Sequence, residues 1–126
     1  MGRTFVEAII TGPLDTRRYS FFVDTGSALM GLPMEEIEAL GLPKVPDGQA
    51  RFLTATGIVE LDTYTLTGRL LVDRPRGNGF SAMVAPAPIP LIGYERLQNM
   101  RLRVNPVTEQ IEDVPDDVID HPPYFL

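Results

Sequence analysis

Apolar and polar residues alternate along most of the chain, in short segments separated by glycine and proline. A period of two buries one side of a segment and exposes the other, which is typical of β-strands. Twelve prolines and eleven glycines interrupt these segments, which favours strands joined by turns over a helical bundle. We predict strands over residues 5–10, 18–23, 49–53, 58–63, 64–72, 80–85, 101–104 and 110–112.

Two segments carry helix signals instead. Residues 33–41 open with Pro33, place acidic residues in the first turn and close on Gly41, as helix termini commonly do. Residues 94–100 follow a helical spacing of apolar positions. Strands and helices do not alternate in βαβ order. We therefore expect an all-β domain with one or two short helices.

Composition and charge narrow the class of protein. The formal net charge of −6 argues against a nucleic-acid partner, which needs a basic face. No apolar run approaches a membrane span, and Glu7 interrupts the N-terminal stretch where an export signal needs apolar residues. Without cysteine, disulfides and Cys-ligated metals are excluded, and we expect no cofactor. These features predict a cytoplasmic protein without membrane contact. Because the first strand begins so close to Met1, we also expect a complete short protein.

The length of 126 residues suits one domain with one modest core. We expect this domain to cover residues 1–113 and to be followed by a tail over residues 114–126 that is acidic and then aromatic. Such a tail is either a solvated terminus or a segment that packs on a partner subunit or blocks a cleft.

The segment that bears most on chemistry is Phe21 to Ser27, where Asp24 directly follows an apolar strand and precedes Thr25 and Gly26. A carboxylate in this position can have its pKa tuned by desolvation and by neighbouring charge, as catalytic acids require. Asp-Thr-Gly is also ordinary turn chemistry, so the triplet alone leaves both interpretations open.

Three parts of the chain, in order, resemble the retropepsin-like aspartic proteases, the single-domain relatives of retroviral protease. They are Phe22–Ser27, the small-residue segment Leu53–Gly57, and Leu91–Leu97, in which two apolar residues and a glycine lead into a helix. The likeness runs from about Phe5 to Glu112. It implies a closed, half-pepsin β barrel that forms a two-fold homodimer and hydrolyses peptide or protein substrates.

The resemblance also assigns roles to residues. Asp24 of each subunit would form the catalytic dyad, Thr25 would hydrogen-bond across the two-fold axis, and Gly26 would allow substrate backbone to approach. Ser27 would bond the outer oxygen of Asp24 or act as a simple cap. Thr54–Gly57 would form the tip of a flap over the substrate. The expected substrate-binding residues are Ser27, Ala28, Thr54, Ala55, Thr56, Gly57 and Ile92.

Two departures from the retroviral pattern stand out. Retroviral enzymes pair an acidic residue four positions after the catalytic Asp with an arginine after the late glycine. Here the matching positions hold Ala28 and Tyr94, which leaves the stability of a dimer open. The flap also has one glycine, Gly57, where retroviral flaps have several.

Other schemes have less support. The single histidine, His121, lies beyond the predicted domain, so neither a Ser-His-Asp triad nor a zinc site is favoured. Two alternatives to an active protease remain: a non-catalytic peptide-binding or dimerisation module with the same fold, and a protease silenced by its own tail.

Overall fold

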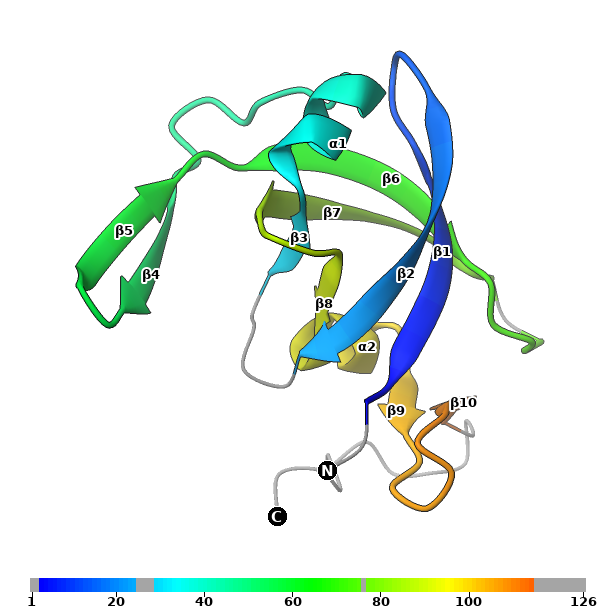
Figure 1. The fold of residues 1–126 in the computed structure, drawn as a ribbon. Coiled ribbons are helices and arrows are strands. Elements are labelled where there is room, and N and C mark those ends of the chain that lie inside the picture. The colour runs from blue at the N-terminus through cyan, green and yellow to red at the C-terminus, as the bar shows by residue number, and fades with distance from the viewer. Residues whose placement is uncertain (1–2, 25–28, 76, 115–126) are drawn as a thin grey trace.

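The computed structural model of the chain describes residues 3–24, 29–75 and 77–114, and its centre is a closed β barrel (Figure 1). Six strands form the barrel in the order β1-β2-β8-β3-β7-β6. The expected all-β fold is confirmed. The barrel strands are β1 (Phe5–Thr11), β2 (Thr16–Asp24), β3 (Met30–Leu32), β6 (Tyr64–Leu70), β7 (Gly79–Pro86) and β8 (Leu91–Gly93).

The first hairpin shows how the sequence pattern produces the barrel wall. In β1, Val6, Ala8 and Ile10 are buried, and the residues between them are at least partly exposed. β2 buries Phe21 and Val23 in the same alternating way and pairs antiparallel with β1. One face of the hairpin thus enters the core, which also takes residues from both helices. The largest fully buried side chains are Phe21, Ile10, Met30, Leu32, Ile37, Leu40, Leu70, Ile92, Leu97 and Leu102.

Barrel closure depends on pairings between distant parts of the chain. β2 and β8 are parallel neighbours, with Phe22 opposite Leu91 and Asp24 opposite Gly93. β3 also runs parallel to β7 and touches β8. The pattern of residues did not predict β3, because three buried residues with Gly31 in the middle show no period.

Both expected helices are present: α1 (Met34–Leu40) and α2 (Tyr94–Asn99). Gly41 ends α1 in the left-handed conformation, with φ of 69°, and its N–H bonds the carbonyl of Glu38. Glycine suits this position because it lacks the Cβ that penalises positive φ. No helix of the described residues has the length and apolar content that a membrane span requires.

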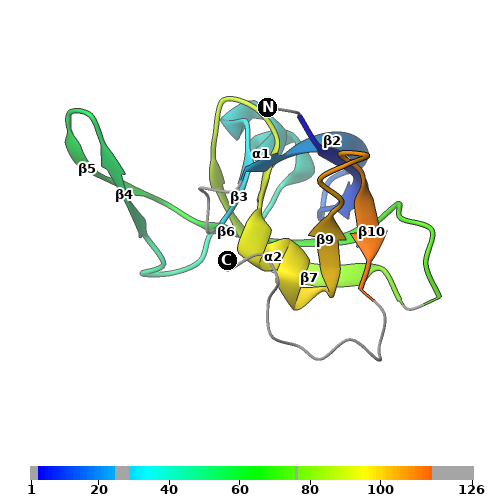
Figure 2. The ribbon, with the colours of Figure 1, turned by 90° about the horizontal axis from the view of Figure 1, so that it is seen from below.

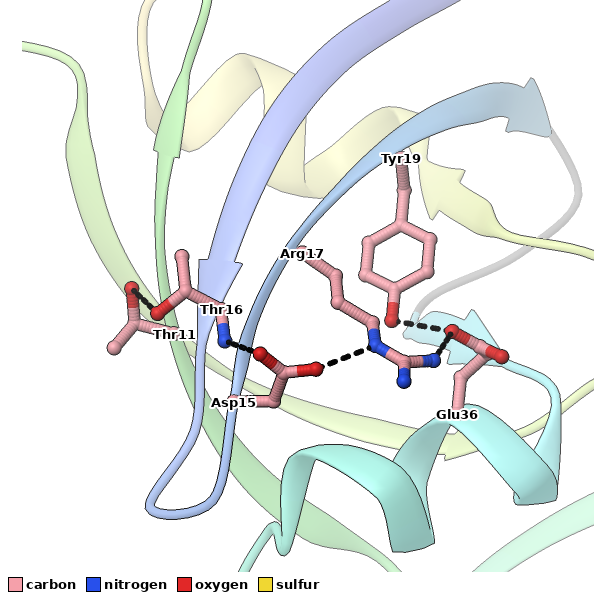
Figure 3. Close-up of polar contacts among 6 residues, drawn as sticks. All are labelled: Thr11, Asp15, Thr16, Arg17, Tyr19 and Glu36. Carbon is pink, nitrogen blue, oxygen red and sulfur yellow. Dashed lines mark hydrogen bonds and ion pairs between the residues drawn. The ribbon is translucent and has the colours of Figure 1, made fainter.

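A polar network joins α1 to the first hairpin (Figure 3). The hydroxyl of Tyr19 donates to Oε1 of Glu36 at 2.7 Å, and Arg17 donates to the same oxygen at 3.0 Å. Arg17 also pairs with Asp15 at 2.8 Å. Burial, followed by the bond to Glu36, raises the pKa of Tyr19, so the phenol stays neutral and can donate.

Two further hairpins lie outside the barrel sheet. β4 (Ala50–Thr54) and β5 (Gly57–Leu61) pair antiparallel around the tip residues Ala55 and Thr56, and they project away from the barrel in Figures 1 and 2. β9 (Leu102–Val104) and β10 (Ile111–Asp113) form the second hairpin, after α2. Both hairpins were expected from the sequence.

One buried arginine connects the loop after β6 to the end of α2. The side chain of Arg74 is only 2% exposed and donates to the carbonyls of Met100 at 2.7 Å and Gly77 at 2.8 Å. It also donates to the side chain of Asn78, whose amide bonds the carbonyl of Val72. The buried guanidinium therefore bonds acceptors from the loop after β6 and from the end of α2 and connects these two parts of the chain.

Candidate active site

Asp24 is the last residue of β2, and its position follows from the parallel pairing with β8. The N–H of Phe22 bonds the carbonyl of Pro90 at 3.0 Å, and the N–H of Val23 bonds that of Thr4 at 2.9 Å. These bonds hold both sides of the strand up to its final residue. The buried side chain of Val23 then fixes the direction in which Asp24 leaves the barrel wall.

Asp24 is half-buried and lies in a pocket of about 510 Å³. The lining is largely apolar, and it comes from four parts of the chain. Pockets of this size with few polar groups are the usual form of ligand sites. The lining residues are Asp24, Leu29, Met30, Gly31, Ala50, Arg51, Phe52, Leu53, Leu61, Ala85, Pro86, Ala87, Pro88 and Leu91.

The β4–β5 hairpin covers one side of this pocket with its stem. Arg51, Phe52 and Leu53 line the pocket, although the side chain of Leu53 is 86% exposed. Arg51 pairs across the hairpin with Glu60 at 3.0 Å. An apolar side chain with so much open surface is available to a bound partner.

The base of the same hairpin is tied to the barrel. Asp62 accepts from Gln49 at 3.1 Å and pairs with Lys44 at 3.3 Å, and these contacts lower the pKa of Asp62. Thr63 is buried and donates its hydroxyl to the carbonyl of Gly48. The hairpin is thus anchored at its base, whereas its outer end has few contacts with the rest of the chain.

The tip residues of the hairpin behave differently from its stem. Ala55, Thr56 and Gly57 are exposed and do not line the pocket as it stands. Gly57 has a φ of 127°, and a Cβ added there would meet nothing within 4 Å. The tip therefore depends on the conformational freedom of glycine and not on its small size.

The remaining expected site residues fall in three groups. Thr25, Gly26, Ser27 and Ala28 lie outside the described residues, as does His121. The backbone of Thr54 closes β4. Ile92 is fully buried in the core and not in the pocket, where its neighbour Leu91 lies instead. Successive residues of a strand face opposite sides, so Leu91 faces the pocket and the next residue, Ile92, faces the core.

Sequence reasoning did not identify most of the pocket wall. Gly31 and the run Pro86–Pro88 approach Asp24 through the pairing of β3 with β7 and β8. The only sequence feature that pointed to this wall was the repeated proline in residues 86–90, which favours an extended backbone.

Tyr94, at the position of the retroviral arginine, is the first residue of α2 and packs, partly buried, against the core.

We compared both the sequence and the structure of the chain with known proteins. The sequence profile of a family described as "Aspartyl protease" matches residues 6–114. The protease of simian foamy virus (mac) has a similar structure, with a TM-score of 0.53 and 20% identity over 77% of this chain and 94% of that one. EIAV protease, in complex with the inhibitor HBY-793, gives a TM-score of 0.53 and 21% identity over 79% and 88%.

A retropepsin-like aspartic protease from Rickettsia conorii is also similar, with 22% identity over 82% of this chain and 85% of that one and a TM-score of 0.49. No curated protein matches the sequence. At these identities the two viral proteases show the fold, and the family profile covers the strand that ends at Asp24 and the hairpin beside it.

Proposed function

Because this chain belongs to the aspartyl protease family and has a retropepsin-like fold, we propose that it is an aspartic endopeptidase that works as a homodimer. The observation that carries the proposal is the place of Asp24. It ends a strand bonded on both sides and stands half-buried in an apolar pocket beside a projecting hairpin.

The chemistry requires two carboxylates that share one proton. In the described part of the chain, Asp24 is the only carboxylate in its pocket, so the second is Asp24 of the partner subunit across a two-fold axis. The ionised carboxylate accepts a proton from a water molecule as that water attacks the scissile carbonyl carbon. The protonated carboxyl donates to the carbonyl oxygen. The resulting tetrahedral intermediate collapses when a proton passes to the leaving amine nitrogen.

In this proposal the β4–β5 hairpin forms part of the substrate-binding site. A peptide lying in the pocket in extended form would contact Leu53 and Phe52 on one side and Leu91 and Pro86 on the other. Closure of the hairpin over the peptide would exclude water from the reacting bond. Apolar side chains of the substrate would contribute most of the binding free energy, through the surface that they bury.

The decisive test replaces Asp24 by asparagine, which keeps the size of the side chain and removes its charge. We expect cleavage of an unstructured protein substrate to fall at least about a thousandfold, with folding and dimerisation unchanged. Asp47→Asn is the matched control. It makes the same change on an exposed loop outside the pocket, at a φ of 53° that asparagine accepts.

A dilution series tests whether the activity depends on the dimer. Specific activity should fall as the protein is diluted through the dissociation range measured by analytical ultracentrifugation. Cleavage that survives in Asp24→Asn would contradict the proposal. A dimer that binds peptide without turnover would instead identify a non-catalytic peptide-binding module.

A further inference from the structure

A second and larger cavity, of about 780 Å³, lies beside β6 and β7, and Asp24 does not line it, although the cavity shares Leu29 and Met30 with the Asp24 pocket. We call it the outer groove. The exposed Thr65 and Thr67 of β6 line it, and so does the buried Leu66 between them, so the cavity lies between the surface and the core. Met83 of β7 lies opposite Thr65 and is 45% exposed. The groove thus offers an apolar methionine and threonine methyl groups to a partner.

Arg96 gives the outer groove a charge. This half-buried arginine of α2 lines the groove, and no salt bridge joins it to any acidic side chain of the described residues. A guanidinium beside apolar surface is stabilised by a carboxylate that reaches it, because both groups are then partly shielded from water. The groove therefore fits a segment that combines acidic and apolar residues.

The chain itself contains such a segment beyond the described residues. Residues 115–126 hold Asp116, Asp117 and Asp120 and then Tyr124–Leu126. The segment starts beside α2, since the N–H of Val114 bonds the carbonyl of Arg101 at 2.9 Å. Its twelve residues can span about 40 Å when extended, compared with a radius of gyration of about 14 Å for a domain of this size. Arg96 and the whole outer groove are within that reach.

Charge also distinguishes the outer groove from the Asp24 pocket. The pocket contains the Asp24 carboxylate, and its arginine, Arg51, is already paired with Glu60. A segment with three aspartates would be repelled there and attracted by Arg96.

We propose that residues 115–126 bind in the outer groove of their own subunit, with an aspartate on Arg96 and an aromatic side chain on Met83. The tail then fills the outer groove next to the Asp24 pocket without covering Asp24, which does not line the groove.

A spin label tests this placement in the full chain. Because the chain has no cysteine, Pro122→Cys gives a single attachment site next to the aromatic residues. With nitroxide attached, amide signals of Thr65, Thr67 and Met83 should broaden more strongly in two-dimensional NMR than those of Arg51–Leu53. Stronger broadening at Arg51–Leu53 would place the tail in the Asp24 pocket and overturn the proposal, as would weak broadening spread over the whole surface.

Two variants and one mixing experiment complete the test. Arg96→Gln should remove most of the broadening at Met83. Arg69→Gln, which removes the same charge from an exposed position outside the groove lining, should leave it in place. Equal effects of both variants would contradict a specific role for Arg96. In the mixing experiment, chains that carry the nitroxide but no isotope label are combined with isotope-labelled chains that carry no nitroxide. The signals of the isotope-labelled chains should not broaden. Broadening would show that the tail of one subunit binds to another subunit.

Discussion

At the scale of single residues, Arg74 occupies the position that most strictly requires one type of side chain. Its side chain is almost fully buried, and its partners are mainly backbone carbonyls rather than one opposing carboxylate. Among the described residues, the carboxylate of Asp113 lies at 3.5 Å and forms an ion pair with Arg74. Arginine fits here because its planar guanidinium carries five N–H donors on three nitrogens, whereas a lysine ammonium has three donors on a single nitrogen.

We expect Arg74→Gln to lower the free energy of unfolding by about 3 kcal/mol, because the part-buried carbonyl of Met100 loses a charged donor and the buried position of the guanidinium loses its hydrogen bonds. The measurement is the urea midpoint at pH 7. Arg69→Gln removes an equally charged but exposed side chain and should change stability by less than about 0.5 kcal/mol. Similar losses in both variants would show that Arg74 acts only through the net charge.

At the scale of elements, the β4–β5 hairpin has a stable base and a loosely held end. Lys44, Gln49 and Thr63 tie the base down, whereas Leu53 and Ile58 near the tip are 86% and 68% exposed. Elements with few buried contacts open at lower free energy than the core. A flap needs this combination, because it must move without carrying the barrel with it.

Gly57→Ala should impair this movement without unfolding the domain. Alanine at a φ of 127° is strained by about 1–3 kcal/mol, although the site has open space for the methyl group. We expect kcat/KM to fall about tenfold, and the free energy of unfolding measured in urea to fall by no more than this strain, so that the domain stays folded. Gly77→Ala is the control, since Gly77 also has open space but no positive φ. A loss of the same size in Gly77→Ala would rule out backbone strain as the cause.

Elements differ in how far the sequence predicted them. Both helices, the first hairpin and the β4–β5 and β9–β10 hairpins follow from period and turn residues. The three-residue strand β3 does not, because Gly31 sits at its centre and its burial comes from neighbours far along the chain. The pocket shows the same limit. Asp24 was identified from its segment, but the choice of Leu91 over Ile92 depends on a register that only barrel closure sets.

At the scale of the whole molecule, hydrogen bonds lower the pKa of several carboxyl groups in the folded chain. The main donors are Tyr19 and Arg17 for Glu36, Ser20 and Arg18 for Glu7, Arg17 for Asp15, Gln49 for Asp62, and Asn105 and Arg103 for Glu112. A group with a lowered folded pKa binds fewer protons when folded than when unfolded in the range between the two values. Folding stability therefore rises with pH across that range.

We expect the free energy of unfolding to be steady above about pH 5 and to decrease as the pH falls below about 4.3, the ordinary glutamate pKa. Chemical denaturation at intervals from pH 3 to pH 7 measures this. Tyr19→Phe removes the largest contribution to the lowered pKa of Glu36, so its acid slope should be shallower. Tyr64→Phe is the control, and a constant stability down to pH 3 would contradict the assignment.

The parallel pairing of β2 with β8 also affects when the fold can form during synthesis of the chain. Phe22 can meet Leu91 only after all the residues between them have been made, and pairings between such distant segments form slowly. Asp24 emerges early in synthesis, yet the strand that positions it arrives late. The pocket around Asp24 can therefore form only after both of these strands have left the ribosome.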